Sequence, residues 1–443
     1  MVNDMTEGKP LQLVVSFFIP LLLGNLFQQL YNMVDSIVVG KGINDQALAA
    51  VGSTSSINFF IFGFVIGLTN GIAILMAQAF GAKEYDRLCR VIAMSVVLCF
   101  AVAITMSIIS FFGGRWILLK LKTPPEILED ALIYIKIIYV GIIVTVANNI
   151  CVSLLRALGD SKTPLIAIAG ASVLNLVLDI VLIIGFKTGV AGAAYATVFA
   201  QLCSVSYCVG RLRKIEVLQF KKQHWKINLP LISQLFKMGI PVAIMNSITA
   251  IGGMALQYYV NVLGAAYTAA YSACMKLLIF FEQPGLNMGF TISTFAGQNL
   301  GAKKVERIGV GLRKCVIIST GINIVLGAML ILIPEQLASI MLSDPTIIAH
   351  TKEFLPIGGM FIWILGFLFI FRSASQGMGH TVIPMLSGIV ELILRIAVVL
   401  IVRESFGFAG IAIAEVSAWT GAALMLMIYY FHVISFHQKQ VVT

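Results

Sequence analysis

The stretch PLLLGNLFQQLYNMVDSIVVGKG, residues 20–42, sets a single acid, Asp35, among mostly apolar residues. It belongs to an apolar segment at 13–40. A bilayer core about 30 Å thick needs roughly 20 apolar residues in a helix that rises 1.5 Å per residue. The segment is therefore long enough to cross a membrane. Pro20 predicts a kink inside this helix, because proline has no N–H to donate to the preceding turn.

The composition of the whole chain agrees with this segment. Of 443 residues, 59% are hydrophobic and 11% are charged, and the mean hydropathy is +0.96. Soluble domains average about 45–50% apolar and about 25% charged residues. This excludes an ordinary soluble enzyme, a disordered protein and a DNA-binding domain, and predicts an all-α polytopic membrane protein. The net charge of +10 does not indicate a nucleic-acid partner, because Lys and Arg gather on the cytoplasmic loops of membrane proteins.

About twelve apolar segments are long enough to span the bilayer. Their limits are 13–40, 47–80, 91–119, 127–154, 164–185, 189–210, 230–262, 267–297, 313–341, 351–373, 382–402 and 407–434. With the N-terminus inside, the loops hold 19 basic residues on the inner side and 7 on the outer side. Basic residues favour the cytoplasmic side. We therefore expect a multi-pass protein of the plasma membrane with both termini in the cytoplasm.

The chain repeats itself at an offset near 220 residues. AQAFGAKEYDR (77–87) matches AGQNLGAKKVER (296–307), and GVAGAAYATVFA (189–200) matches GFAGIAIAEVSA (407–418). RALGDSKTP, which begins at Arg156, matches SQGMGHTVIP, which begins at Ser375. Pro20 pairs with Pro241. We therefore expect an N-terminal six-helix lobe (1–210), a solvated cytoplasmic linker (211–228) and a C-terminal six-helix lobe (229–443). An even number of helices per lobe predicts a pseudo-twofold axis along the membrane normal.

This plan resembles the multidrug and toxic compound extrusion (MATE) transporters. The likeness covers nearly the whole chain and includes the stretch at 20–42, the AQAFGAK loop and LRALGDSKTPL (155–165). It implies a transporter without a cofactor, driven by an ion gradient, that exports small organic molecules, and we expect a monomer. Walker A, HExxH and strand-linked GxGxxG motifs are missing from the sequence, so we expect neither an enzyme nor direct use of ATP.

Asp35 and Asp179 are acids in predicted membrane helices, where a charge costs at least about 2.5–3.5 kcal/mol. Asn175 precedes Asp179 by four residues and shares its helical face. At 1.5 Å per residue, both acids and Thr197 fall in one layer of the N-lobe. Chemistry alone leaves two interpretations, which are ion coupling and a polar cluster that fixes helix packing.

The family resemblance favours ion coupling. In the DinF-like branch an Asp in helix one and an Asn/Asp pair in helix five bind the cation or proton, and these positions match Asp35, Asn175 and Asp179. Tyr139 and Thr197 match further members of that site, although Tyr139 could equally be an aromatic packing residue. The acids of helices seven and ten in the NorM-like branch are absent. We therefore expect H⁺ as the coupling ion, with Na⁺ at Asp35, Asn175, Asp179 and Thr197 as the alternative.

The C-lobe carries further charges in its predicted helices. Glu391 and Arg395 are spaced i,i+4, which predicts a structural salt bridge. Glu415 is the repeat equivalent of Thr197, and Lys276 and Glu282 lack an obvious local partner. The candidates for the substrate cavity are Gln29, Asn32, Met33, Asn149, Lys276, Glu282 and Glu415. The histidines, His224 among them, are expected at the solvated surface.

These features predict a secondary-active multidrug antiporter that exports cationic, amphipathic compounds by alternating access. The alternatives are a lipid-linked oligosaccharide flippase of the same superfamily and a membrane scaffold that transports nothing. Few buried cations argue against the flippase, and the acids of the N-lobe argue against the scaffold.

Overall fold

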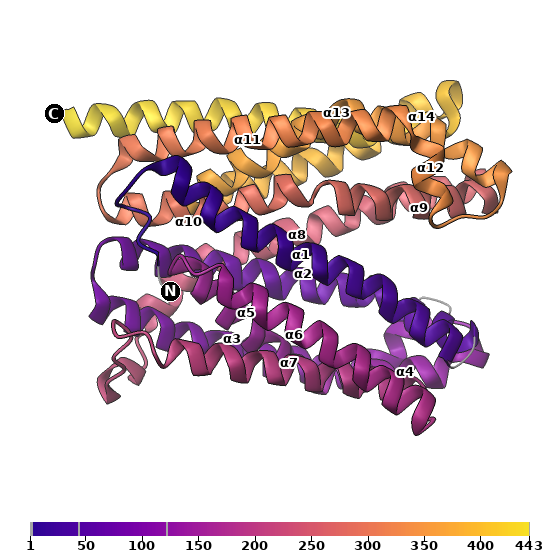
Figure 1. The fold of residues 1–443 in the computed structure, drawn as a ribbon, viewed down its shortest axis with the longest axis horizontal. Helices are drawn as coiled ribbons and strands as arrows, with labels where there is room; N and C mark the ends of the chain where they lie inside the picture. Colours follow the sequence, from indigo (N-terminus) through magenta and orange to yellow (C-terminus); the bar gives the residue numbers. More distant parts are fainter. Residues whose placement is uncertain (1–2, 43–44, 121–122, 443) are drawn as a thin grey trace. The chain divides into compact units, whose positions relative to one another are not determined.

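The computed structural model describes the backbone of residues 3–42, 45–120 and 123–442, without the side chains of 33–42, 45–46, 48–49, 55–56 and 433–442. These described residues fold into helices and contain no strand (Figure 1). The first half contains α1 (Pro10–Gly42), α2 (Asp45–Gly81), α3 (Tyr85–Lys120), α4 (Pro125–Val140), α5 (Ile142–Ala157), α6 (Lys162–Asp179), the π-helix η1 (Ile180–Gly185), α7 (Val190–Leu212) and the 3₁₀-helix η2 (Lys222–Trp225). The second half contains α8 (Leu229–Leu263), α9 (Ala265–Phe281), α10 (Gln283–Gly301), α11 (Val305–Leu332), α12 (Pro334–Ser339), α13 (Pro345–Gly377) and α14 (Val382–Val442).

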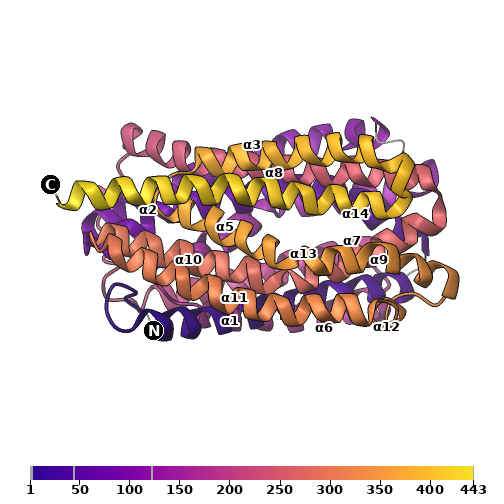
Figure 2. The same cartoon turned by 90° about the horizontal axis from the view of Figure 1, so that it is seen from above.

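The long segment α14 is two helices joined at Gly407, whose backbone lies at φ 52° and ψ −125°. A β-carbon added to Gly421 would contact Leu394, so residues on either side of Gly407 pack against each other. Figure 2 shows α14 turning back on itself. The two predicted helices at 382–402 and 407–434 are therefore both present. Glycine fits this turn because a side chain at positive φ would be strained.

Two predicted spans are broken into shorter helices. The segment predicted at 127–154 bends by 48° between α4 and α5, at Gly141. The segment predicted at 267–297 breaks at Glu282, because Pro284 in the first turn of α10 cannot donate a backbone hydrogen bond.

The helix count agrees with the sequence. Within the described ranges nine helices are long and apolar enough to cross a membrane, and the bent pair α4/α5 makes a tenth. Counting α14 as two helices and α9/α10 as one gives about twelve long helices, as predicted.

The contacts divide the chain into two compact units. The first contains residues 1–4 and 19–239, and the second contains residues 5–18 and 240–443. Both boundaries inside helices fall one residue before a proline, Pro20 in α1 and Pro241 in α8. The start of α8 belongs to the first unit because it packs closely on α2: a β-carbon on Gly71 would lie 2.6 Å from the carbonyl oxygen of Met238.

Backbone conformation repeats along the chain as the sequence does. Lys83 and Lys303 both have a φ of 59°, and Gly159 and Gly379 have φ values of 78° and 91°. Each pair is 220 residues apart. A non-glycine residue rarely adopts a positive φ, so its recurrence at the same repeat position indicates the same turn. The two loops that carry the AQAFGAK and GQNLGAK motifs therefore end their helices in the same way.

The N-terminal segment docks on the GQNLGAK loop of the second unit. The N–H of Met5 donates to Oε1 of Gln298 at 2.8 Å, and Asn299 Nδ2 donates to the Met5 carbonyl at 3.1 Å. Lys304 Nζ donates to the carbonyl of Thr6, and Arg307 Nη2 to that of Gly8, at 2.9 and 3.0 Å. Met5 is completely buried. Residues 5–8 are therefore a specific strap, here called the N-strap.

The linker docks on the first unit in a similar manner. His224 is 1% exposed, and its Nε2 lies 2.9 Å from Oδ1 of Asp86, at the start of α3. Its Nδ1 accepts the N–H of Lys221 at 3.1 Å. The prediction of a surface position for His224 is wrong, whereas most of the other linker residues are exposed. A histidine with two satisfied ring nitrogens can be buried in a loop, which composition cannot show. Residues 217–225 are called the linker strap below.

Candidate functional site

Asn175 and Asp179 lie one turn apart on α6, and both are buried, at 3% and 0% exposure. The backbone becomes π-helical directly after Asp179, over Ile180–Gly185. π-Helical turns are rare and occur often at functional sites. The turn shifts the register of the helix after the acid, and the one glycine in it, Gly185, is its last residue.

Thr197 lies at the level of Asp179 in the hairpin of α6, η1 and α7. Ile183 and Ala193 pack together in one buried cluster, next to Tyr134 of α4. Asp179 precedes Ile183 by four residues and Thr197 follows Ala193 by four, which is about 6 Å along each helix. Because the two helices of the hairpin are antiparallel, the step from Ile183 to Asp179 and the step from Ala193 to Thr197 run in the same direction. Thr197 is half-buried, and its hydroxyl donates to the Ala193 carbonyl at 3.0 Å, which leaves lone pairs to accept or ligate.

Tyr139 is fully buried one residue before the end of α4, next to the bend at Gly141. Gly141 permits the bend because a β-carbon there would overlap the side chain of Val198 on α7. The bend therefore brings the end of α4 against the turn of α7 that contains Thr197. The Tyr139 hydroxyl and the Asn175 amide nitrogen have no hydrogen-bond partner among the described side chains. Such groups are costly to bury and need a partner.

Two of the predicted residues, Asp35 and Met33, lie outside the residues whose side chains the structure describes. Both belong to α1. The described part of the site therefore consists of Asn175, Asp179, Thr197 and Tyr139, drawn from α4, α6 and α7 of the first unit.

The cavity candidates of the first unit are polar and accessible to different degrees. Gln29 is half-buried, and Asn32 is exposed and accepts a hydrogen bond from Gln28 Nε2 at 3.1 Å. Asn149 is half-buried, and its Nδ2 donates to the carbonyl of Thr145 at 2.9 Å.

Lys276 and Glu282 differ from each other in the second unit. Lys276 is exposed on α9, five residues before this helix ends at Phe281, and its place at the substrate cavity stays a prediction. Glu282 is half-buried at the break between α9 and α10. Of the two, Glu282 is therefore the charge that approaches the interior of the unit.

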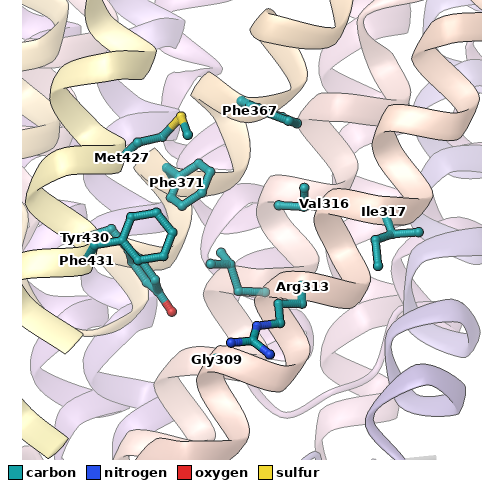
Figure 3. A pocket seen from close by; sticks show the side chains of 10 residues that line it. Gly309, Arg313, Val316, Ile317, Phe367, Phe371, Met427, Tyr430 and Phe431 are labelled. Atoms are coloured by element: carbon teal, nitrogen blue, oxygen red, sulfur yellow. The ribbon is translucent and has the colours of Figure 1, made fainter. Parts of the chain in front are cut away.

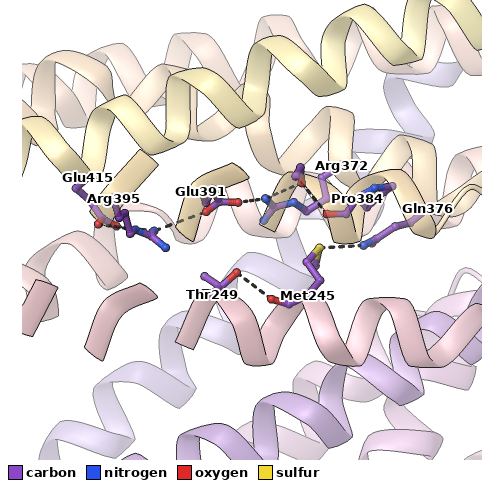
Figure 4. A network of polar contacts seen from close by, with 9 residues as sticks. Met245, Thr249, Arg372, Gln376, Pro384, Glu391, Arg395 and Glu415 are labelled. Carbon is purple, nitrogen blue, oxygen red and sulfur yellow. Dashed lines mark hydrogen bonds and ion pairs between the residues drawn. The ribbon is translucent and has the colours of Figure 1, made fainter. Parts of the chain in front are cut away.

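A chain of buried ions crosses the second unit (Figure 4). Glu391 contacts Arg372 on one side and lies 3.6 Å from Arg395 on the other, which confirms the predicted i,i+4 salt bridge. Arg395 continues to Glu415 through two hydrogen bonds of 2.8 Å, Nε to Oε2 and Nη2 to Oε1. All four residues are at most 6% exposed. Two arginines and two glutamates cancel in charge, as a membrane interior requires.

Arg372 is the one member of this chain that is not predicted from the sequence as a buried charge. The sequence predicts it in an inner loop, but it lies inside α13, is 6% exposed, and also donates to Ser387 Oγ at 3.1 Å. Without Arg372, the inner loops hold 18 basic residues and the outer loops hold 7. Its sequence neighbours FIFRSASQG gave a weak signal, since three apolar residues precede it directly. Gly252 of α8 makes room for the ion chain, because a β-carbon there would lie 2.7 Å from Nη1 of Arg395.

Comparison with known proteins connects this fold to a family. The MatE family model matches the chain twice, at residues 20–181 and 241–401, which are the two repeats. The chain belongs to the MatE family. This is a family of multidrug efflux transporters, and its members are not enzymes.

Individual MatE relatives cover most of the chain. Probable multidrug resistance protein YpnP of Bacillus subtilis (strain 168) is 28% identical over 85% of this chain and 84% of its own. Probable multidrug resistance protein YoeA of the same organism is 27% identical over 96% of this chain and 94% of its own. A crystal structure of MATE in complex with MaL6 aligns with a TM-score of 0.93 at 22% identity, over 98% of this chain and 99% of that one. The fold is therefore that of a multi-pass MATE transporter.

Proposed function

We propose that this protein is an ion-coupled antiporter whose coupling ion, H⁺ or Na⁺, binds at Asp35, Asn175 and Asp179 with Tyr139 and Thr197. The observation that carries the proposal is the complete burial of Asp179 beside the buried Asn175 in one apolar helix hairpin. A carboxylate so far from water is costly unless a proton neutralises it or a cation pairs with it. Ion binding at this position therefore has a large effect on the energy of the hairpin.

The polar groups around Asp179 suit either ion. A proton on the acid would create a hydroxyl donor for a neighbouring acceptor. Sodium would instead use oxygen ligands, which Asp35, Asn175, Asp179 and Thr197 carry. We favour the proton, because it needs no complete shell of oxygen ligands.

Coupling follows if the ion has different affinities for the outward-open and inward-open states. A ligand shifts a conformational equilibrium only through such a difference. The π-helical turn after Asp179 supports this role, since π-helical segments accommodate local rearrangement at functional sites. Binding at Asp179 can thereby change the packing of η1 on α7.

We infer that the exported substrates are organic, cationic and amphipathic. The relatives YpnP and YoeA are named as multidrug resistance proteins, and the half-buried Glu282 offers a negative group to a cation. We further propose a monomer in the plasma membrane with both termini in the cytoplasm, which the excess of basic residues on the inner loops supports.

The test is drug efflux from proteoliposomes under an imposed pH gradient or an imposed Na⁺ gradient. Wild type is compared with Asp179→Asn and Asp35→Asn. Glu404→Gln serves as the matched control, because its side chain is 84% exposed and loses the same charge. We expect efflux driven by the pH gradient, lost in both Asp variants and kept in the control. Efflux at the wild-type rate from both Asp variants would overturn the site, and efflux without any gradient would overturn antiport.

A further inference from the structure

A pocket of about 550 Å³ opens on the second unit, between α11, α13 and the second helix of α14 (Figure 3). This volume is within the range of sites that hold one small molecule, about 300–1,000 Å³. Four aromatic rings form one wall. Phe371 packs against Tyr430 and Phe431 with ring centroids 5.5 and 5.9 Å apart. Phe367 and Met427 close the far end. The site is not part of the proposed ion site, which lies in the other unit.

One end of the pocket is polar. Figure 3 shows the guanidinium of Arg313 and the hydroxyl of Tyr430 at the same end, away from Met427 and Phe367. Tyr430 is 1% exposed, and its hydroxyl has no hydrogen-bond partner among the described residues. Arg313 is exposed at the mouth. The pocket therefore combines a long apolar interior with a cation and an unused hydroxyl at a single end, which is the pattern of a site for an amphiphilic anion.

The depth of Arg313 fits the headgroup region of a bilayer. The helix α11 has 28 residues and so is about 42 Å long, which exceeds the hydrocarbon core by about 12 Å. Arg313 lies eight residues, or about 12 Å, from the start of this helix, near one of its ends. In the proposed orientation this end faces the cytoplasm. The rim residues Ile317 and Phe431 are 65% and 57% exposed, so lipid is the medium that surrounds the pocket.

We propose that this pocket binds an anionic phospholipid of the cytoplasmic leaflet. One acyl chain lies against Phe367, Phe371 and Met427, and the phosphate accepts hydrogen bonds from Arg313 and from the Tyr430 hydroxyl. Charge complementarity selects this occupant, because a guanidinium binds phosphate in a bidentate manner and repels the cationic drugs proposed as substrates. The position in the inner leaflet rests on the proposed orientation, whereas the chemistry of the pocket does not.

The test measures lipid retention and is independent of transport. Full-length protein is purified in detergent, exposed to mixed phosphatidylglycerol and phosphatidylcholine, and analysed by native mass spectrometry. The variants are Arg313→Gln, which removes the cation, and Val316→Trp, which fills the pocket. Lys314→Gln is the matched control, because it removes the same charge one residue away from a side chain that does not line the pocket. Thermal unfolding confirms that each variant is folded.

We expect one phosphatidylglycerol molecule to be retained at least tenfold better than phosphatidylcholine. Arg313→Gln and Val316→Trp each lower this retention about tenfold, and Lys314→Gln changes it less than twofold. Equal retention of both lipids, or an equal loss in Lys314→Gln and Arg313→Gln, would overturn the site. Displacement of the lipid by ethidium with undiminished affinity in Arg313→Gln would also overturn it, since the pocket would then bind drugs. None of these outcomes bears on ion coupling at Asp179.

Discussion

Arg395 holds both carboxylate oxygens of Glu415, with Nε to Oε2 and Nη2 to Oε1 each at 2.8 Å. The two residues come from the two helices that meet at Gly407, so the pair ties the hairpin of α14 together. Both side chains are nearly inaccessible. Removing either charge leaves the other buried and incompletely paired, which is the costly situation for an ion in an apolar interior.

We predict that Glu415→Gln destabilises the protein by about 3–5 kcal/mol, the usual effect of breaking a buried ion pair. The measurement is thermal or denaturant unfolding in detergent. Arg403→Gln provides the control, because Arg403 and Glu404 form an exposed pair with 3.9 Å between Nη2 and Oε1. We expect Arg403→Gln to lower the free energy of unfolding by less than about 1 kcal/mol. Equal stabilities of Glu415→Gln and wild type would contradict a structural role for the ion chain.

Replacing Tyr139 by Phe separates packing from ion binding. The hydroxyl has no hydrogen-bond partner among the described side chains. Its removal should therefore leave the free energy of unfolding unchanged or raise it slightly. If the hydroxyl belongs to the ion site, gradient-driven efflux falls at the same time. Tyr195→Phe is the control, since Tyr195 is 58% exposed on α7. A variant with lower stability and normal efflux would show that Tyr139 only packs.

The N-strap provides a test by hydrogen exchange. Arg307→Gln removes donors to the Gly8 carbonyl and to Asn299 Oδ1, and charged donors contribute about 1.5–3 kcal/mol each. We expect amide exchange at Met5 and Thr6 to become at least tenfold faster. Arg87 occupies the equivalent repeat position but pairs with the exposed Glu84, so Arg87→Gln should leave the strap unchanged. The same acceleration in both variants would mean that the bonds of Arg307 do not hold the strap.

Gly159 and Gly170 differ in the space and the backbone conformation that an alanine side chain would find at each position. At Gly159 the φ of +78° strains any side chain, and a β-carbon would overlap the carbonyl of Asn3, so we expect Gly159→Ala to cost about 1–3 kcal/mol. Gly170 lies inside α6 with nothing near its position. Gly170→Ala should therefore stabilise the helix by about 0.5–1 kcal/mol. If the local backbone controls both effects, unfolding measurements should show a lower stability for Gly159→Ala and a higher stability for Gly170→Ala than for wild type.

The sequence predicted the helices well because each one had to be apolar over its whole length. It also placed Asn175 and Asp179 on one face, since that relation needs only the helical period. The bend at Gly141 and the π-helical turn after Asp179 escaped prediction. Both depend on contacts with α7, such as the one between Gly141 and Val198, and contacts between helices leave no period in the sequence.

Charges were harder to place than apolar residues. Arg372 is predicted in a cytoplasmic loop but is buried inside α13. Composition shows that a charge lies in a span, but its environment depends on the partner that faces it. Arg372 has Glu391 as its partner, 19 residues away in the chain. Such a pairing becomes visible only when the fold brings the two helices together.

The two straps give the protein an order of assembly. Met5 bonds to Gln298, 293 residues further along the chain. At a synthesis rate of about 5–20 residues per second, roughly 15–60 seconds pass before its partner exists. During that time the N-strap cannot form its bonds to the GQNLGAK loop, whereas the linker strap can dock on α3 as soon as it emerges. The N-strap can therefore close only after residues 298–307 of the second half have been made, much later than the linker strap.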